Sequence, residues 1–173
     1  MYQEKDKSYG IIALIYYIIY CFGLLLSGIM YRKGITYGMN FIYCLMFVVG
    51  VLIVLIKDKS IYNLGLHENE KIKTNLIISC IIIAITFTVV LIFSNLPLKK
   101  LIIQMLYYLF YIAAIEEILF RGLIQNYLFG FKFNRYLIFI IGAIFFSFMH
   151  IPFQMFRHNN VSLTYIILKQ FLI

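Results

Sequence analysis

Residues 101–129 read LIIQMLYYLFYIAAIEEILFRGLIQNYLF, an apolar stretch whose only charged residues are Glu116, Glu117 and Arg121. A transmembrane helix needs about 20 largely apolar residues, so this stretch is long enough to cross a membrane either tilted or extended past the bilayer edge. A charged group near the bilayer centre costs about 2.5 to 3.5 kcal/mol on insertion scales. Three of them in one span therefore indicate a functional site.

The composition of the whole chain favours the same class of protein. Of 173 residues, 64% are hydrophobic and 13% are charged, whereas an ordinary soluble domain is about half apolar and a quarter charged. The other charged residues lie at the N-terminus, in short connections or in the last stretch. We therefore predict an all-α fold, a polytopic transmembrane helix bundle, forming a single integral membrane domain over residues 1–173 with a motif core at 101–151.

Charged and turn residues divide the sequence into five complete predicted spans and a partial sixth. They are residues 11–30, 38–56, 76–93, 101–129 and 136–151, the last with a continuation past Pro152 to Phe156, and then 161–173. Thirteen residues rise only about 20 Å, short of the roughly 30 Å hydrocarbon core, so we expect the chain to be truncated at its C-terminus. With the N-terminus in the cytoplasm, the inner segments hold eight basic residues and the outer ones five. This bias predicts a multi-pass protein of the cell membrane with a cytoplasmic N-terminus.

The net charge of +8 would suggest nucleic-acid binding in a soluble domain. In a membrane protein, short basic loops set the topology and contact anionic head groups, so we expect membrane lipids as partners and no nucleic acid. Cys21, Cys44 and Cys80 all lie inside apolar runs and are best explained as small buried hydrophobes.

Helical spacing separates the two glutamates. Glu117 and Arg121 are four residues apart, the favourable arrangement for an ion pair on one helix face. Glu116 is turned about 100° from Glu117 and is left less fully neutralised. Such a pair suggests one carboxylate as general acid or base and the other as a structural anchor. The alternative is a buried charged cluster that only locks helices together.

His150 closes the fifth predicted span. Phe146 precedes it by one turn and Ser147 by three residues, so His150 lies on a defined face from which it could point toward the glutamates. A purely interfacial histidine is the alternative. His67 and His158 lie in polar connections, where we expect solvation or lipid contact and no chemistry.

The two motif segments resemble a known family. Residues 116–121 (EEILFR) fit an EExxxR motif and residues 146–150 (FSFMH) fit an FxxxH motif of the CPBP family. Its members are CAAX prenyl endopeptidases of the Ras-converting type and bacterial relatives linked to bacteriocin processing and self-immunity. Residues 63–66 (NLGL) are similar to a short LGL-type element of such proteins.

The resemblance implies an intramembrane endopeptidase that hydrolyses a peptide bond in a membrane-associated substrate. In that family pattern Glu116 activates water, His150 is its partner, and Glu117 and Arg121 supply supporting charges. Members are described both as metalloproteases and as metal-independent glutamate proteases. A divalent metal such as zinc, if present, would be held by Glu116 and His150, and the substrate is a peptide or protein with or without a prenyl group.

One departure from the family pattern concerns a third motif, a histidine followed four positions later by Asn or Asp on a later helix. His158 is followed at that spacing by Ser162, so we do not transfer the role. We accordingly expect little or no peptidase activity from residues 1–173 alone. Two other functions stay open: a non-enzymatic membrane protein on the same scaffold, for bacteriocin immunity or partner binding, and a proton-coupled transporter.

Overall fold

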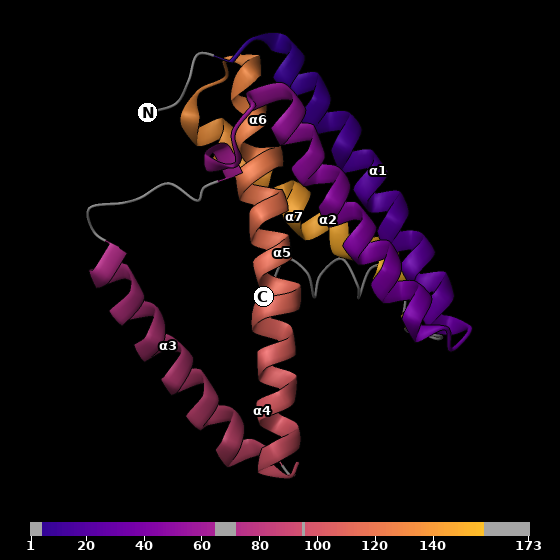
Figure 1. Ribbon diagram of the computed structural model, residues 1–173, viewed down its shortest axis with the longest axis vertical. Helices are drawn as coiled ribbons and strands as arrows, with labels where there is room; N and C mark the ends of the chain where they lie inside the picture. The colour runs from indigo at the N-terminus through magenta and orange to yellow at the C-terminus, as the bar shows by residue number, and fades with distance from the viewer. Residues whose placement is uncertain (1–4, 65–71, 95, 158–173) are drawn as a thin grey trace. The chain divides into compact units, whose positions relative to one another are not determined.

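The described part of the chain consists of helices joined by short connections. A computed structural model describes residues 5–64, 72–94 and 96–157, and in these ranges it contains helices and no strand (Figure 1). The predicted all-α class is therefore confirmed. The predicted partial span at 161–173 and the residue His158 lie outside the described residues, as does His67.

Four described helices are long and apolar enough to cross a membrane. They are Lys7–Arg32 (α1), Thr36–Asp58 (α2), Leu98–Phe131 and Arg135–Phe156, the last forming most of α7 (Arg135–Arg157). They confirm four of the predicted spans, including the continuation of the fifth past Pro152. The third predicted span, residues 76–93, is also helical and lies within α3 (Ile72–Phe93).

The long helix at residues 98–131 is not uniformly α-helical. It consists of α4 (Leu98–Leu106), the π-helical η2 (Tyr107–Ala113), α5 (Ala114–Glu117), the π-helical η3 (Ile118–Gln125), α6 (Asn126–Leu128) and the 3-10 turn η4 (Phe129–Phe131). Lys132 then takes a left-handed conformation at φ 57°, which ends the helix before α7. Both π segments border the four residues that contain the glutamate pair.

The described helices form two compact units. The first comprises residues 1–65 and 118–173, with α1, α2, the short 3-10 helix η1 (Ile61–Leu64), η3, α6, η4 and α7. The second comprises residues 66–117, with α3, α4, η2 and α5. The expectation of one integral membrane domain over residues 1–173 stays a prediction.

Small residues on α1 and α2 allow the helices of the first unit to approach closely. A Cβ at Gly28 of α1 would lie 3.2 Å from the backbone of Phe153 on α7, and one at Gly50 of α2 would lie 2.5 Å from the Leu119 side chain. Helices in a membrane associate through such small residues, because lipid supplies no hydrophobic driving force between them. Tyr16 of α1 is fully buried and donates a hydrogen bond to the Met46 carbonyl at 2.7 Å.

A polar cluster closes one end of this unit. Lys5 is buried, with only 6% of its surface exposed. Its ammonium nitrogen lies 4.5 Å from the ring centroid of Tyr127 and 5.2 Å from that of Tyr9. Tyr127 donates a hydrogen bond to an Asp58 carboxylate oxygen at 3.1 Å. The cluster thus joins the N-terminal segment to the end of α2 and to α6 through cation–π contacts and a charge-assisted hydrogen bond.

Candidate functional site

The glutamate pair lies on α5, a four-residue α-helical segment between two π-helical segments. Glu116 is half-buried and Glu117 is exposed. π-helical turns are rare, and those found inside α-helices frequently lie at functional sites. The sequence predicted a membrane helix here and gave no sign of the π segments, whose i→i+5 bonding depends on how neighbouring groups pack.

The backbone between Glu117 and Arg121 differs from the one assumed in the sequence argument. Ile118–Gln125 is π-helical, so angular separations taken from an ideal α-helix do not apply across it. The boundary between the two compact units also falls directly after Glu117. The ion pair of Glu117 with Arg121, and the convergence of Glu116 with His150, therefore stay predictions.

Arg121 is exposed on η3, where most of the other residues are buried. Leu119, Phe120, Leu123 and Ile124 around it are all buried. Gly122, the next residue, faces Leu64 of η1 so closely that a Cβ would lie 2.5 Å from the Leu64 carbonyl oxygen. This contact brings the described part of the LGL-type element against the motif helix, a juxtaposition that the sequence did not predict.

His150 lies half-buried on α7 and is held by the first residue of its own motif. The rings of Phe146 and His150 meet edge-to-face, with centroids 5.2 Å apart and planes at 87°. Phe146 in turn meets Phe120 edge-to-face at 5.1 Å and 85°. Phe120 belongs to the EExxxR segment, so an aromatic chain connects the two motif segments within the first unit.

A third helix supports this aromatic chain. Tyr17 of α1 stacks on Phe145 with ring centroids 4.3 Å apart and donates a hydrogen bond to the Phe145 carbonyl at 3.2 Å. The Tyr17 ring also meets Phe120 edge-on at 6.2 Å. Sequence reasoning missed Tyr17 because it is one of 15 tyrosines in an apolar chain and no spacing distinguishes it.

The donor set does not make a zinc site of the usual kind. A catalytic zinc ion usually has three protein ligands, and Glu116 with His150 would supply two. No group of three or more His, Cys, Asp or Glu side chains suited to a metal ion occurs among the described residues.

Comparison with known proteins supports the family resemblance. The model of the family described as Type II CAAX prenyl endopeptidase Rce1-like matches residues 97–172. The matched segment contains Glu116, Glu117, Arg121 and His150. Comparisons with curated proteins and with solved structures each gave no match.

The match confirms the resemblance found in the two motifs. Residues 97–172 are thus similar to a family of CAAX prenyl endopeptidases, which are hydrolases. Together with the apolar helices, this indicates a multi-pass membrane protein.

Proposed function

We propose that this protein is an intramembrane endopeptidase in which Glu116 activates the attacking water. The family match over residues 97–172 carries the proposal, because it spans both motif segments. The chain of contacts from Phe120 through Phe146 to His150 supports it, since a histidine held by packing keeps one orientation for chemistry.

The proposed reaction is a water-mediated amide hydrolysis. The Glu116 carboxylate accepts a proton from water while the water oxygen bonds to the peptide carbonyl carbon. The carbonyl electrons move onto oxygen, and His150 is assigned to orient the water or stabilise that oxyanion. When the tetrahedral intermediate collapses, the C–N bond breaks and Glu116 returns its proton to the leaving amine.

Glu117 and Arg121 have supporting roles in this proposal. Their opposite charges stabilise each other in a low-dielectric setting and hold the helix that carries Glu116. The substrate is a membrane-associated peptide or protein, and the protein acts in the cell membrane with its N-terminus in the cytoplasm.

Substitution of the two glutamates tests the assignment. The protein produced from its complete reading frame is purified in nanodiscs and incubated with peptides that carry an apolar stretch, with and without a prenylated C-terminal cysteine. We expect Glu116→Gln to abolish cleavage while the melting temperature stays near that of the parent, because the amide keeps the shape and lacks the base. Glu117→Gln should lower both yield and activity, because it leaves Arg121 without a countercharge.

Two outcomes decide against the proposal. Equal cleavage by Glu116→Gln and the parent would indicate a non-enzymatic protein or a contaminating peptidase. Loss of folding in Glu116→Gln as severe as in Glu117→Gln would make Glu116 structural. Treatment with a chelator, followed by cleavage and zinc add-back, separately decides whether a divalent metal takes part.

A further inference from the structure

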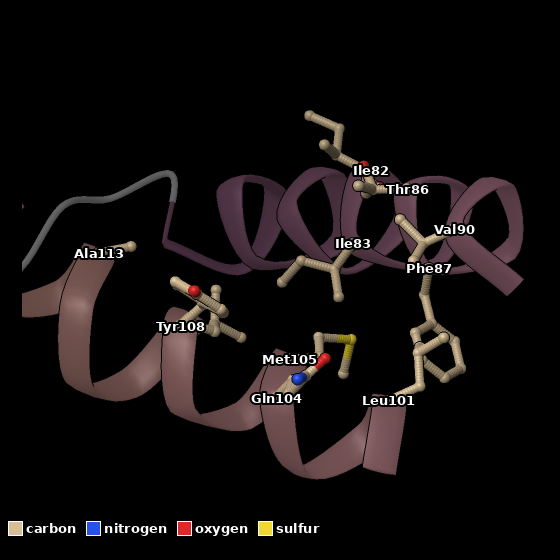
Figure 2. A pocket seen from close by; sticks show the side chains of 11 residues that line it. Ile82, Ile83, Thr86, Phe87, Val90, Leu101, Gln104, Met105, Tyr108 and Ala113 are labelled. Carbon is tan, nitrogen blue, oxygen red and sulfur yellow. Dashed lines mark hydrogen bonds between the residues drawn. The ribbon is translucent and has the colours of Figure 1, made fainter. Parts of the chain in front are cut away.

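The second compact unit contains an apolar groove of about 470 Å³ between α3 and the helix formed by α4 and η2 (Figure 2). Ile83 and Phe87 of α3 project toward Met105 and Leu101 of α4. The groove continues along the second helix as far as Ala113. Its walls are almost wholly apolar, so a fitting ligand presents hydrocarbon.

The few polar groups in the wall do not alter this conclusion. Thr86 is one of them, and its hydroxyl donates to the Ile82 carbonyl of its own helix at 2.9 Å. Gln104 and Tyr108, the other polar residues there, carry no formal charge. The groove therefore offers no ionic partner along its length.

Positive charge gathers at one end of the groove. Lys99 and Lys100 are exposed in the first turn of α4, directly before the lining residue Leu101. Pro97 at the N-cap offers no side-chain acceptor to the first backbone N–H groups of this helix. The positive end of the helix dipole adds to the two ammonium groups, so this end suits an anion.

The length of the groove matches one leaflet. From Leu101 to Ala113 a continuous α-helix would rise about 18 Å, and the π-helical turns at Tyr107–Ala113 shorten this rise, so the groove spans at most about half of the roughly 30 Å hydrocarbon core. A ligand with an anionic head and one long hydrocarbon chain satisfies both the charged end and the apolar walls. Basic pockets between transmembrane helices bind anionic lipids in this way.

We propose that this groove binds one acyl chain of an anionic membrane phospholipid, with the lipid phosphate at Lys99 and Lys100. An uncharged hydrocarbon would use the walls and leave the lysines without a role, so the charge complementarity favours the phospholipid. The proposal does not depend on peptidase activity. Because Ala113 precedes Glu116 by three residues in the same unit, the bound chain would end close to the proposed base along the helix.

The test uses photoreactive lipids and the full chain in nanodiscs. Phosphatidylglycerol and phosphatidylcholine probes carry the same diazirine-labelled acyl chain, and mass spectrometry measures the label in peptides covering residues 77–93 and 98–113. We expect the phosphatidylglycerol probe to label these peptides several-fold more than the phosphatidylcholine probe. The double variant Lys99→Gln/Lys100→Gln should reduce its labelling to the phosphatidylcholine level, and Lys99→Arg/Lys100→Arg should retain it.

Two further variants keep the test decisive. Ile83→Trp fills the groove and should lower labelling with the lysines intact, whereas Arg32→Gln/Lys33→Gln removes a basic pair at the end of α1 and should leave labelling unchanged. Equal labelling by the two lipids, or an equal loss in the Arg32/Lys33 control, would overturn the proposal. A prenylated peptide is also tested as a competitor of the lipid probe. If it displaces the label and binds the Lys99→Gln/Lys100→Gln variant as tightly as the parent, the groove binds substrate and the lipid proposal is overturned.

Discussion

The Phe146 ring lies edge-on to the imidazole of His150, with their centroids 5.2 Å apart, and the same phenylalanine contacts Phe120 from the other motif segment. The spacing of the FxxxH motif thus has a physical meaning here. Residues four apart on a helix meet on one face, so the phenylalanine restricts the histidine ring. Phe120 in turn packs Phe146 against η3, the helix that carries Arg121.

Replacing Phe146 should reduce both activity and stability. Phe146→Leu removes two edge-to-face contacts, each worth about 0.5 to 1.5 kcal/mol, and frees the His150 ring, so we expect roughly a tenfold loss of kcat/KM. Peptide cleavage in nanodiscs measures it. Phe41→Leu, at a position 67% exposed on α2, is the matched control and should behave as the parent. A Phe146→Leu enzyme with parental kcat/KM would refute the role in holding His150.

Tyr17 should contribute through its hydroxyl and its ring separately. Tyr17→Phe loses the hydrogen bond to the Phe145 carbonyl and keeps the stacked ring, so we expect destabilisation of about 1 kcal/mol. Tyr17→Leu loses the stacking as well and should be less stable still. Thermal unfolding in detergent gives both values, with Tyr37→Phe at a 90% exposed site as control. Identical melting of Tyr17→Phe and Tyr17→Leu would mean that the ring contacts do not contribute.

Gly122 should not tolerate a side chain. In Gly122→Ala the new methyl group would approach the rigid backbone of Leu64 to 2.5 Å, so the motif helix or η1 must shift. Overpacking of this kind costs about 1 to 3 kcal/mol, and displacement of Arg121 should lower cleavage too. Gly142→Ala is the control, because its methyl group would meet the flexible Gln125 side chain at 3.2 Å. The prediction fails if the two alanine variants are equally stable.

The buried ammonium of Lys5 should make stability depend on pH. Burial lowers the pKa of Lys5 to about 8, although the charge of Asp58 opposes the shift. In the unfolded chain the pKa of Lys5 is near its ordinary value of 10.5. Between about pH 8 and pH 10.5 the unfolded chain therefore binds more protons than the folded one, so the free energy of unfolding rises with pH over this range. The melting temperature of the parent minus that of Lys5→Met should therefore increase from pH 7.5 to 9.5. The exposed Lys7→Met control should show no such trend, and a flat difference for Lys5→Met would exclude a shifted Lys5.

The positions of the helices could be predicted from the sequence, but the contacts between them could not. Long apolar runs ended by charged and turn residues predict membrane spans, because burying charge in hydrocarbon is costly. The three charges inside one run identified the candidate site for the same reason.

The supporting contacts depend on which faces of distant helices meet. Tyr17 and Phe145 are 128 residues apart, and nothing in either local sequence specifies the pair. The approach of Gly122 to Leu64 likewise needs a glycine whose reason is visible only in three dimensions. The π-helical segments around Glu116 and Glu117 arise from the hydrogen-bonding pattern of the folded backbone, and no residue type marks them in a sequence.

A double-mutant cycle on Glu116 and His150 tests the central claim most directly. Cleavage of the same peptide is measured for the parent, Glu116→Gln, His150→Gln and the double variant, all in nanodiscs and all checked for parental melting. If the two residues act as one catalytic unit, each single variant loses nearly all of the rate enhancement and the double variant is no worse than either. Losses that multiply in the double variant, or a Glu116→Gln protein that retains parental kcat/KM, would contradict the account.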